Sequence, residues 1–183
     1  MSALHSWPSE ENAFKTWLGD NATEVLKSVG IARGQTVVDY GCNVGRFTLP
    51  AAGIVGPEGK VYALDIDTTA LQTLRSRADA QGLDNIEIIA VQDERDPLLA
   101  LRETADVVLL FDVLQVVNDK QALMKKIHSM LKQDCILSIF PMHVGVHRAL
   151  ELALQGGLFT LKDQHGMLLN FKRCSSNTAV SKV

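Results

Sequence analysis

The 183-residue sequence has no long apolar run, few aromatic residues and only three cysteines. Its apolar stretches, such as residues 107–111, are too short to span a bilayer, so we expect no membrane insertion. The first fourteen residues lack a basic region followed by an apolar one, so we expect no secretory signal. Cys42, Cys135 and Cys174 are too widely spaced for a zinc knuckle or a redox pair, which favours a reduced, cytoplasmic chain.

Charge of neither sign dominates the sequence. It has 18 Lys and Arg residues against 21 Asp and Glu residues, a formal net charge of -3. Nucleic acid is therefore an unlikely partner by electrostatics alone, because binding to phosphates depends on an excess of positive charge. Hydrophobic residues make up 46% of the chain and charged residues 21%, which is typical of a globular protein, and the length fits one domain.

Short β-branched runs alternate with helical patterns along the chain. A helical region is expected over residues 9–29, with Ser9 as a candidate N-cap, and a short helix after the glycine turn to about residue 55. Further helices are expected over residues 68–82, 119–133 and 144–155. Strands are expected over residues 36–40, 60–67, 85–93, 105–112 and 135–140, followed by a hairpin around "DQHG". This alternation predicts an α/β fold with a doubly wound, mostly parallel sheet that ends in an antiparallel hairpin.

Four of the predicted strands end in carboxylates, Asp39, Asp65, Asp93 and Asp112. Each of them taken alone is explained equally well as a loop or helix-cap residue. In a doubly wound sheet, however, the carboxyl ends of the strands lie along one edge, where ligands bind. Four acids at matching positions therefore favour a ligand site at that edge.

The stretch "VVDYGCNVGRF" leads from the first strand into a turn that contains Gly41, Asn43 and Gly45. Glycines there let the backbone approach a ligand closely, and Asp65, twenty residues after Gly45, stands where an acid can bind a ribose diol. The dinucleotide fingerprint G-x-G-x-x-G is absent, because Asn43 and Arg46 occupy the second and third glycine positions. The phosphate-binding pattern G-x-x-x-x-G-K-[ST] is absent as well.

The pattern D-x-G-x-N-x-G at residues 39–45 resembles motif I, D/E-x-G-x-G-x-G, of class I S-adenosylmethionine (SAM)-dependent methyltransferases. Four later segments, "VYALDID", "VQDERD", "ADVVLLFDVLQVV" and "MLKQDCILSIF", are similar to that family in the same order. The resemblance covers residues 36–173. It implies a Rossmann-like methyltransferase fold with a seven-stranded sheet and a reversed terminal hairpin, and S-adenosyl-L-methionine as the cofactor.

The resemblance also implies the site residues. The cofactor-binding positions would be Asp39, Gly41, Asn43, Gly45, Asp65, Ile66, Asp93 and Asp112. Of these, Asp65 would hold the ribose and Asp93 the adenine, while Asp112 with Gln115 would form the floor of the active site. His143, just past the fifth strand, is a candidate for lining the acceptor pocket.

Two departures from the family pattern are visible, Asn43 in place of the middle glycine and "KQDC" in place of a glycine pair. Asn tolerates a positive φ, so the turn is expected to persist, although its side chain would crowd the methionine end of the cofactor. No (D/N)-P-P-(Y/F) signature follows the fourth strand, which lowers the expectation of amide or exocyclic amine methylation. A small-molecule acceptor is the expected partner.

Residues 31–174 are expected to form the methyltransferase domain, and residues 175–183 a frayed tail. Residues 1–30 form an N-terminal helical segment in which Trp7, Phe14 and Trp17 favour either a lid or ordinary core packing.

His143 and His147 have the i, i+4 spacing of a metal pair, but with no third ligand in view no metal site is expected. Methyl transfer depends chiefly on positioning, so no catalytic base is assigned. Two alternatives to a methyltransferase remain open: a non-catalytic SAM-binding regulatory or partner subunit, and a nicotinamide oxidoreductase.

Overall fold

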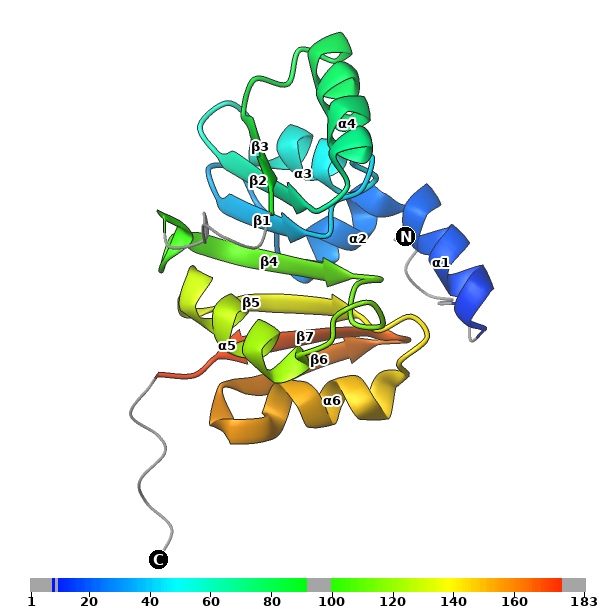
Figure 1. The fold of residues 1–183 in the computed structure, drawn as a ribbon, viewed down its shortest axis with the longest axis vertical. Coiled ribbons are helices and arrows are strands. Elements are labelled where there is room, and N and C mark those ends of the chain that lie inside the picture. Colours follow the sequence, from blue (N-terminus) through cyan, green and yellow to red (C-terminus); the bar gives the residue numbers. More distant parts are fainter. Residues whose placement is uncertain (1–7, 9, 92–99, 176–183) are drawn as a thin grey trace, which may run out of the picture.

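A seven-stranded sheet forms the centre of the computed structural model, which describes residues 8, 10–91 and 100–175 (Figure 1). The strands are β1 (Thr36–Tyr40), β2 (Lys60–Asp65), β3 (Ile86–Ala90), β4 (Ala105–Phe111), β5 (Leu131–Phe140), β6 (Phe159–His165) and β7 (Leu168–Arg173). Their order is β3-β2-β1-β4-β5-β7-β6. The first five strands are parallel, whereas β7 runs antiparallel to both β5 and β6. The predicted fold class is confirmed.

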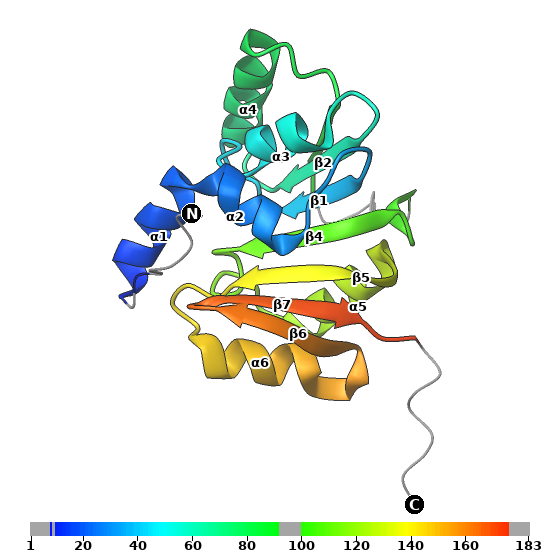
Figure 2. The same ribbon diagram turned by 180° about the vertical axis from the view of Figure 1, so that it is seen from behind.

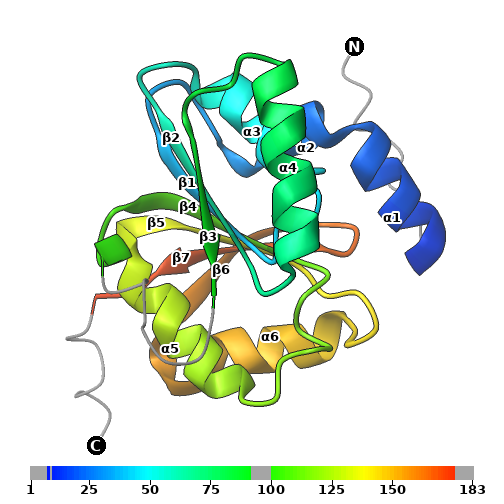
Figure 3. The same ribbon diagram turned by 45° about the horizontal axis from the view of Figure 1, so that its top comes forward.

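Helices cover both faces of this sheet. They are α1 (Glu11–Asp20), α2 (Ala22–Val29), α3 (Thr48–Val55), α4 (Thr68–Ala80), α5 (Lys120–Met130), α6 (Val146–Leu154) and the short 3₁₀ helix η3 (Gln155–Gly157). Helices α2, α3 and α4 pack on one face, and α5 and α6 on the other (Figures 1 and 3). The chain is therefore doubly wound, as the alternation of strands and helices predicts.

The two faces of the sheet bury two hydrophobic clusters. Val37 belongs to the cluster beneath α2, α3 and α4, while its neighbour Val38 belongs to the cluster beneath α5 and α6. Both side chains are fully buried. Because successive strand residues point to opposite faces, a strand covered on both sides is apolar at almost every position, which explains the continuous run of β4.

The prediction of a helical region over residues 9–29 missed one feature, since this region divides into the two helices α1 and α2 at Asn21. The Asn21 side chain donates from Nδ2 to the carbonyl of Trp17 at 2.8 Å. The Asn21 backbone is no longer helical, with φ -112° and ψ 27°. Asn side chains compete in this way with the helical hydrogen bonds of the main chain. The predicted cap, Ser9, lies outside the described residues.

The boundary between the helix predicted over residues 119–133 and the strand predicted over residues 135–140 is also wrong, since α5 ends at Met130 and β5 begins at Leu131. Leu131 is fully buried and pairs with Ala105, and the pairing of the two strands then shifts register before Ile136. A helical periodicity cannot reveal this pairing, because it depends on a strand far away in the sequence.

The terminal hairpin is confirmed, but its turn lies later than predicted. Residues 163–165 belong to β6, and the turn consists of Gly166 and Met167. Asp163 accepts a hydrogen bond from Nδ2 of Asn170 on β7, so this part of "DQHG" is held in the sheet. None of the helices in the described part of the chain has both the length and the apolarity needed to cross a membrane.

Candidate functional site

A cavity of about 330 Å³ lies at the carboxyl edge of the sheet, beneath α1. Figures 1 and 2 show α1 beside this edge. Helix α1, the loop after β1 and the ends of β4 and β5 form its walls. The lining residues are Lys15, Leu18, Gly41, Cys42, Asn43, Val44, Arg46, Phe47, Phe111, Asp112 and Phe140. Its volume falls in the lower part of the range found for small-molecule sites, roughly 300–1,000 Å³.

Gly41 begins the loop and has a φ of +83°. A Cβ at this position would lie 2.3 Å from Cγ2 of Val113, so both the backbone conformation and the close approach demand glycine. The amides of Gly41 and Cys42 donate to the carbonyl of Leu64, at 2.7 and 3.0 Å. The loop is therefore fixed to the end of β2.

Asn43, which replaces a glycine of the family pattern, adopts the left-handed conformation with a φ of +48°. Its amide donates to Oδ2 of Asp65 at 2.7 Å, and its Oδ1 accepts from the amide of Val44 at 2.7 Å. Asn is one of the few residues that adopt this backbone conformation readily. The side chain lines the cavity and at the same time holds the loop together.

Asp65 lies at the carboxyl end of β2, where sequence analysis placed it. Its two carboxylate oxygens accept from the amides of Asn43 and Asp67, the latter at 3.0 Å. Asp67 ends the loop as the N-cap of α4, accepting from the amides of Thr69 and Ala70. The intervening Ile66 is 76% exposed, so an apolar side chain projects into solvent beside the carboxylate.

Asp39 differs from Asp65 because it is buried within β1, with 2% of its surface exposed. It accepts a hydrogen bond from Oγ1 of Thr48, the first residue of α3, at 2.6 Å. Burial, supplemented by the negative charge of Asp65, raises the pKa of Asp39 from 3.8 to about 6, against the lowering effect of the Thr48 hydrogen bond. Asp39 is absent from the cavity lining and lies behind the loop, where it connects β1 to α3.

Asp112 follows β4 directly and has a φ of +59°. Its carboxylate forms an ion pair with Lys15 of α1, and Gln115 donates from Nε2 to its backbone oxygen and Oδ1, at 2.8 and 2.7 Å. The other side-chain atom of this amide, Oε1 of Gln115, is buried without a hydrogen-bond partner among the described residues. Asp112 and Gln115 therefore lie together, as predicted, but only Asp112 lines the cavity.

His143 lies at the rim of the site rather than in the cavity lining. Its amide donates to Oε1 of Glu11 on α1 at 2.5 Å, and its ring Nδ1 is 3.4 Å from the same oxygen. The side chain is 59% exposed. No group of three or more metal-ligating side chains, around His147 or anywhere else in the described residues, could hold a metal ion.

Aromatic rings wall the cavity and hold α1 in place. Phe47 meets Phe111 edge to face with ring centroids 4.8 Å apart, and Phe14 of α1 stacks on Phe140 at 5.3 Å. Phe14 is fully buried, so this face of α1 belongs to the hydrophobic core. Of the three aromatic residues for which a lid or core packing was expected, Phe14 packs in the core, Trp17 is half-buried against it, and Trp7 lies outside the described residues. The packing of Phe14 brings Lys15 over the cavity.

Sequence reasoning missed Lys15, Thr48, Arg46 and Phe47. Lys15 stands between the buried Phe14 and Leu18 on one helix, but the sequence carries no signal that this helix docks on the carboxyl edge. Arg46 and Phe47 directly follow motif I, so their place in the loop was a usable signal. Asp93, the predicted adenine contact, lies outside the described residues.

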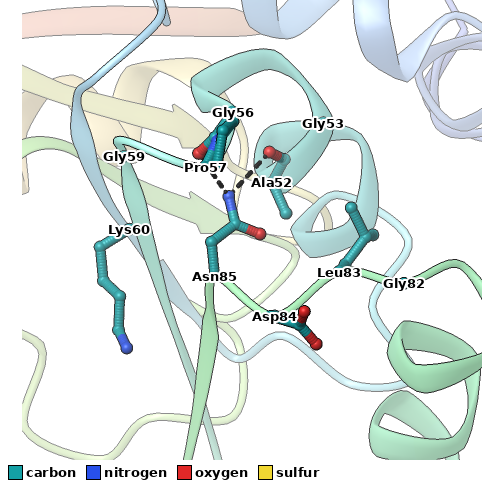
Figure 4. Close-up of a pocket in the computed structure, with 10 residues that line it drawn as sticks. All are labelled: Ala52, Gly53, Gly56, Pro57, Gly59, Lys60, Gly82, Leu83, Asp84 and Asn85. Atoms are coloured by element: carbon teal, nitrogen blue, oxygen red, sulfur yellow. Dashed lines mark hydrogen bonds between the residues drawn. The ribbon is translucent and has the colours of Figure 1, made fainter.

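A second cavity, of about 460 Å³, lies at the opposite edge of the sheet between the end of α3 and residues 82–85 (Figure 4). Asn85 donates from Nδ2 to the carbonyls of Ala52 and Gly56, at 3.0 and 2.8 Å. Both carbonyls also accept a main-chain hydrogen bond at the end of α3, Ala52 from the amide of Gly56 at 3.1 Å and Gly56 from the amide of Gly59 at 3.0 Å. The contacts of Asn85 therefore connect the chain just before β3 to the end of α3.

The sequence model of a protein family described as a methyltransferase domain matches residues 31–156 of this chain. The chain belongs to this methyltransferase family. Its strand order and its similarity to SAM-dependent structures give it the Rossmann-like fold of class I methyltransferases.

One relative of this methyltransferase domain is demethylmenaquinone methyltransferase from Geobacillus stearothermophilus, 28% identical over 109 residues. The match covers 60% of the chain and 46% of that protein, so the chain spans about half the length of the curated relatives it matches.

Among solved structures, a SAM-dependent methyltransferase from Aquifex aeolicus has a TM-score of 0.74 and 19% identity, with 90% of this chain and 99% of that chain covered. A methyltransferase from Geobacter sulfurreducens has a TM-score of 0.64 and 16% identity, covering 92% and 82% of the two chains. At these identities the two structures support the fold alone.

Proposed function

We propose that this methyltransferase domain binds SAM at the carboxyl edge of the sheet and transfers its methyl group to a small-molecule acceptor. The observation that carries the proposal is the carboxylate of Asp65, held 2.7 Å from the amide of Asn43 beside the glycine loop. Family membership supports SAM as the cofactor, and the relative named demethylmenaquinone methyltransferase supports a small acceptor.

In this proposal Asp65 binds the ribose hydroxyls at the end of β2. The carboxylate is already oriented by the amides of Asn43 and Asp67, so little ordering is needed when the cofactor arrives. The exposed side chain of Ile66 provides an apolar contact for the adenine ring, and Asp93 remains the predicted partner of the adenine amino group.

The methionine end of SAM fits the charges of the 330 Å³ cavity. An α-amino acid group carries one ammonium and one carboxylate, and Lys15 with Asp112 presents the complementary cation and anion at the same wall. We assign the cofactor carboxylate to Lys15 and its ammonium to Asp112. Gln115 keeps Asp112 in position through its two hydrogen bonds.

The sulfonium methyl group of SAM is electrophilic by itself, so the protein's task is to align an acceptor with it and to exclude water. The rings of Phe47, Phe111 and Phe140 provide an apolar wall for this purpose. His143 at the rim is the proposed entrance contact for the acceptor. No group in this assignment is required to act as a base.

Calorimetric titration with SAM and S-adenosylhomocysteine tests the cofactor site. Hydrogen bonds to a charged group contribute roughly 1.5–3 kcal/mol, so Asp65→Ala is expected to weaken binding about ten- to a hundredfold. Asp79→Asn, an exposed acid on α4, removes the same charge away from the site and is expected to leave the affinity unchanged. Equal affinities of wild type and Asp65→Ala would refute the assignment.

The same preparations decide between a transferase and a non-catalytic binding subunit. Turnover of SAM to S-adenosylhomocysteine with a panel of small phenols, thiols and amines is expected for a transferase. Tight cofactor binding without turnover across the panel would favour the regulatory alternative. Binding of NADH in place of SAM would favour the oxidoreductase.

A further inference from the structure

Helix α3, with the sequence "TLPAAGIV", contains no charged residue and is apolar on every side. A helix of this kind is normally buried all round. Here, however, Leu49, Pro50 and Ile54 are only half-buried and Gly53 is exposed. The outer face of α3 is therefore an apolar surface that the described part of the chain does not cover.

This surface is the floor of a groove between α2, α3 and α4, which lie side by side in Figure 2. The groove has a volume of about 770 Å³. Its rim carries three cations, Lys27 on α2, Arg46 in the loop before α3, and Arg77 on α4. All the lining residues are among those described, and none of them is acidic, although the whole chain has a net charge of -3.

No acid in the described part of the chain pairs with these three cations. None of them forms an ion pair within the described residues. Arg77 donates instead from Nη1 to the main-chain carbonyl of Val44, at 3.2 Å. The Arg46 guanidinium packs against α1, since a Cβ built on Gly19 would lie 2.6 Å from its Nη1. Arg46 is the one residue that lines both the groove and the cofactor cavity, so the groove adjoins the site assigned to SAM but is otherwise lined by different residues.

We propose that this α3 groove binds an amphipathic anion, a single apolar chain that ends in a phosphate or carboxylate and is free in solution. The apolar floor matches the chain of such a ligand, and the three cations of the rim match its charged end. A bilayer surface fits less well, because protruding apolar groups insert into lipid and the apolar atoms here line a concave surface. An acidic protein segment is the remaining occupant, and the experiment separates it from a small ligand.

Alkyl phosphates of six to twelve carbons, kept below their micelle concentrations, are suitable probes for calorimetric titration of the whole protein at low salt. Burial of one methylene contributes about 0.8 kcal/mol, so the affinity is expected to rise by up to about fourfold per methylene. The uncharged alcohol of the same length is expected to bind more weakly.

Two variants locate this binding in the groove. A Cβ on Gly53 meets no atom within 4 Å, so Gly53→Phe fills the groove without a clash in the core, and at least a tenfold loss of affinity is expected. Lys27→Gln is expected to weaken binding roughly two- to fivefold, as for an exposed ion pair. Lys125→Gln on α5 removes the same charge on the opposite face and is expected to have no effect.

Thermal unfolding curves verify that each variant is folded before it is titrated. Failure of dodecyl phosphate to bind saturably would overturn the proposal and leave the groove to a protein partner. Binding that Gly53→Phe and Lys27→Gln do not weaken would overturn it too, as would adsorption to phosphatidylglycerol vesicles without binding of the monomeric phosphates. Because these readouts require no SAM, they stand apart from the test of the methyltransferase site.

Discussion

Lys15 of α1 forms an ion pair with Asp112 at the end of β4, across 97 positions of sequence. The pair is partly open to solvent, with 43% of the Lys15 side chain and 25% of the Asp112 side chain exposed. Such pairs contribute little to folding, because water and salt screen them. The pair lies in the cavity wall beside the glycine loop, and the proposed function therefore gives it a role in cofactor binding.

A double-mutant cycle with Lys15→Gln and Asp112→Asn separates these two roles. We expect each single variant to lower the affinity for S-adenosylhomocysteine about tenfold or more, because a charge-assisted hydrogen bond is lost. The coupling energy in urea unfolding is expected to be below about 1 kcal/mol. Arg33→Gln, which breaks the exposed pair with Glu58, serves as the control with no effect on cofactor binding.

An unchanged affinity in both single variants would show that the ion pair only docks α1. In that case the position of α1 would depend on its ion pair together with Phe14 and Leu18, whose side chains are fully buried. Lys15 would then have no part in binding the cofactor.

The buried carboxyl of Asp39 predicts an unusual dependence of stability on pH. In the unfolded chain this group releases its proton near its ordinary pKa of 3.8, whereas in the folded protein burial raises the pKa to about 6. Between these values the folded state holds a proton that the unfolded state has lost. The contribution of Asp39 to the free energy of unfolding therefore falls as pH rises from 4 to 6, by at most about 3 kcal/mol, and is constant above.

Urea unfolding from pH 4 to 8 of wild type and Asp39→Asn measures this contribution. The amide has the size of the carboxyl, accepts from Oγ1 of Thr48 through its Oδ1, and does not titrate. We expect the stability of the wild type relative to the variant to decrease across this window. Parallel curves for the two proteins would show that Asp39 titrates at its ordinary pKa.

The fold could be predicted from the sequence because its signals are local. Strands β1 and β4 are covered on both faces and are therefore apolar at successive positions, and the loop after β1 requires glycine at a positive φ. The start of β5 at Leu131 could not be predicted, because it depends on pairing with Ala105.

The same distinction holds for the candidate site. Asp65 and Asp112 were found because strand ends fix their positions, whereas Lys15 reaches the cavity only through the packing of α1. Asp39 was placed at the same edge by its position near a strand end. Its side chain points instead to Thr48, and the direction of a side chain at the end of a short strand depends on what packs there.

Asn43 provides the last prediction, because it departs from the glycine of the family pattern and yet has a φ of +48°. Asn43→Gly keeps this backbone accessible but loses the 2.7 Å hydrogen bond from the amide of Val44 to Oδ1, so a loss of about 1 kcal/mol in the free energy of unfolding is expected. Asn43→Ala loses the same bond and also places a Cβ in the left-handed conformation, which costs roughly 1–2 kcal/mol more.

The order of stability in urea unfolding is therefore expected to be wild type, then Asn43→Gly, then Asn43→Ala. If the position required only the side-chain hydrogen bond, the two variants would be equally destabilised, so their difference measures the demand for a positive φ. For the cofactor, Asn43→Gly is expected to change the affinity for S-adenosylhomocysteine less than Asp65→Ala does, because the main-chain amide that orients Asp65 remains. A marked gain in affinity would instead show that the Asn43 side chain crowds the methionine end of the cavity, which it lines.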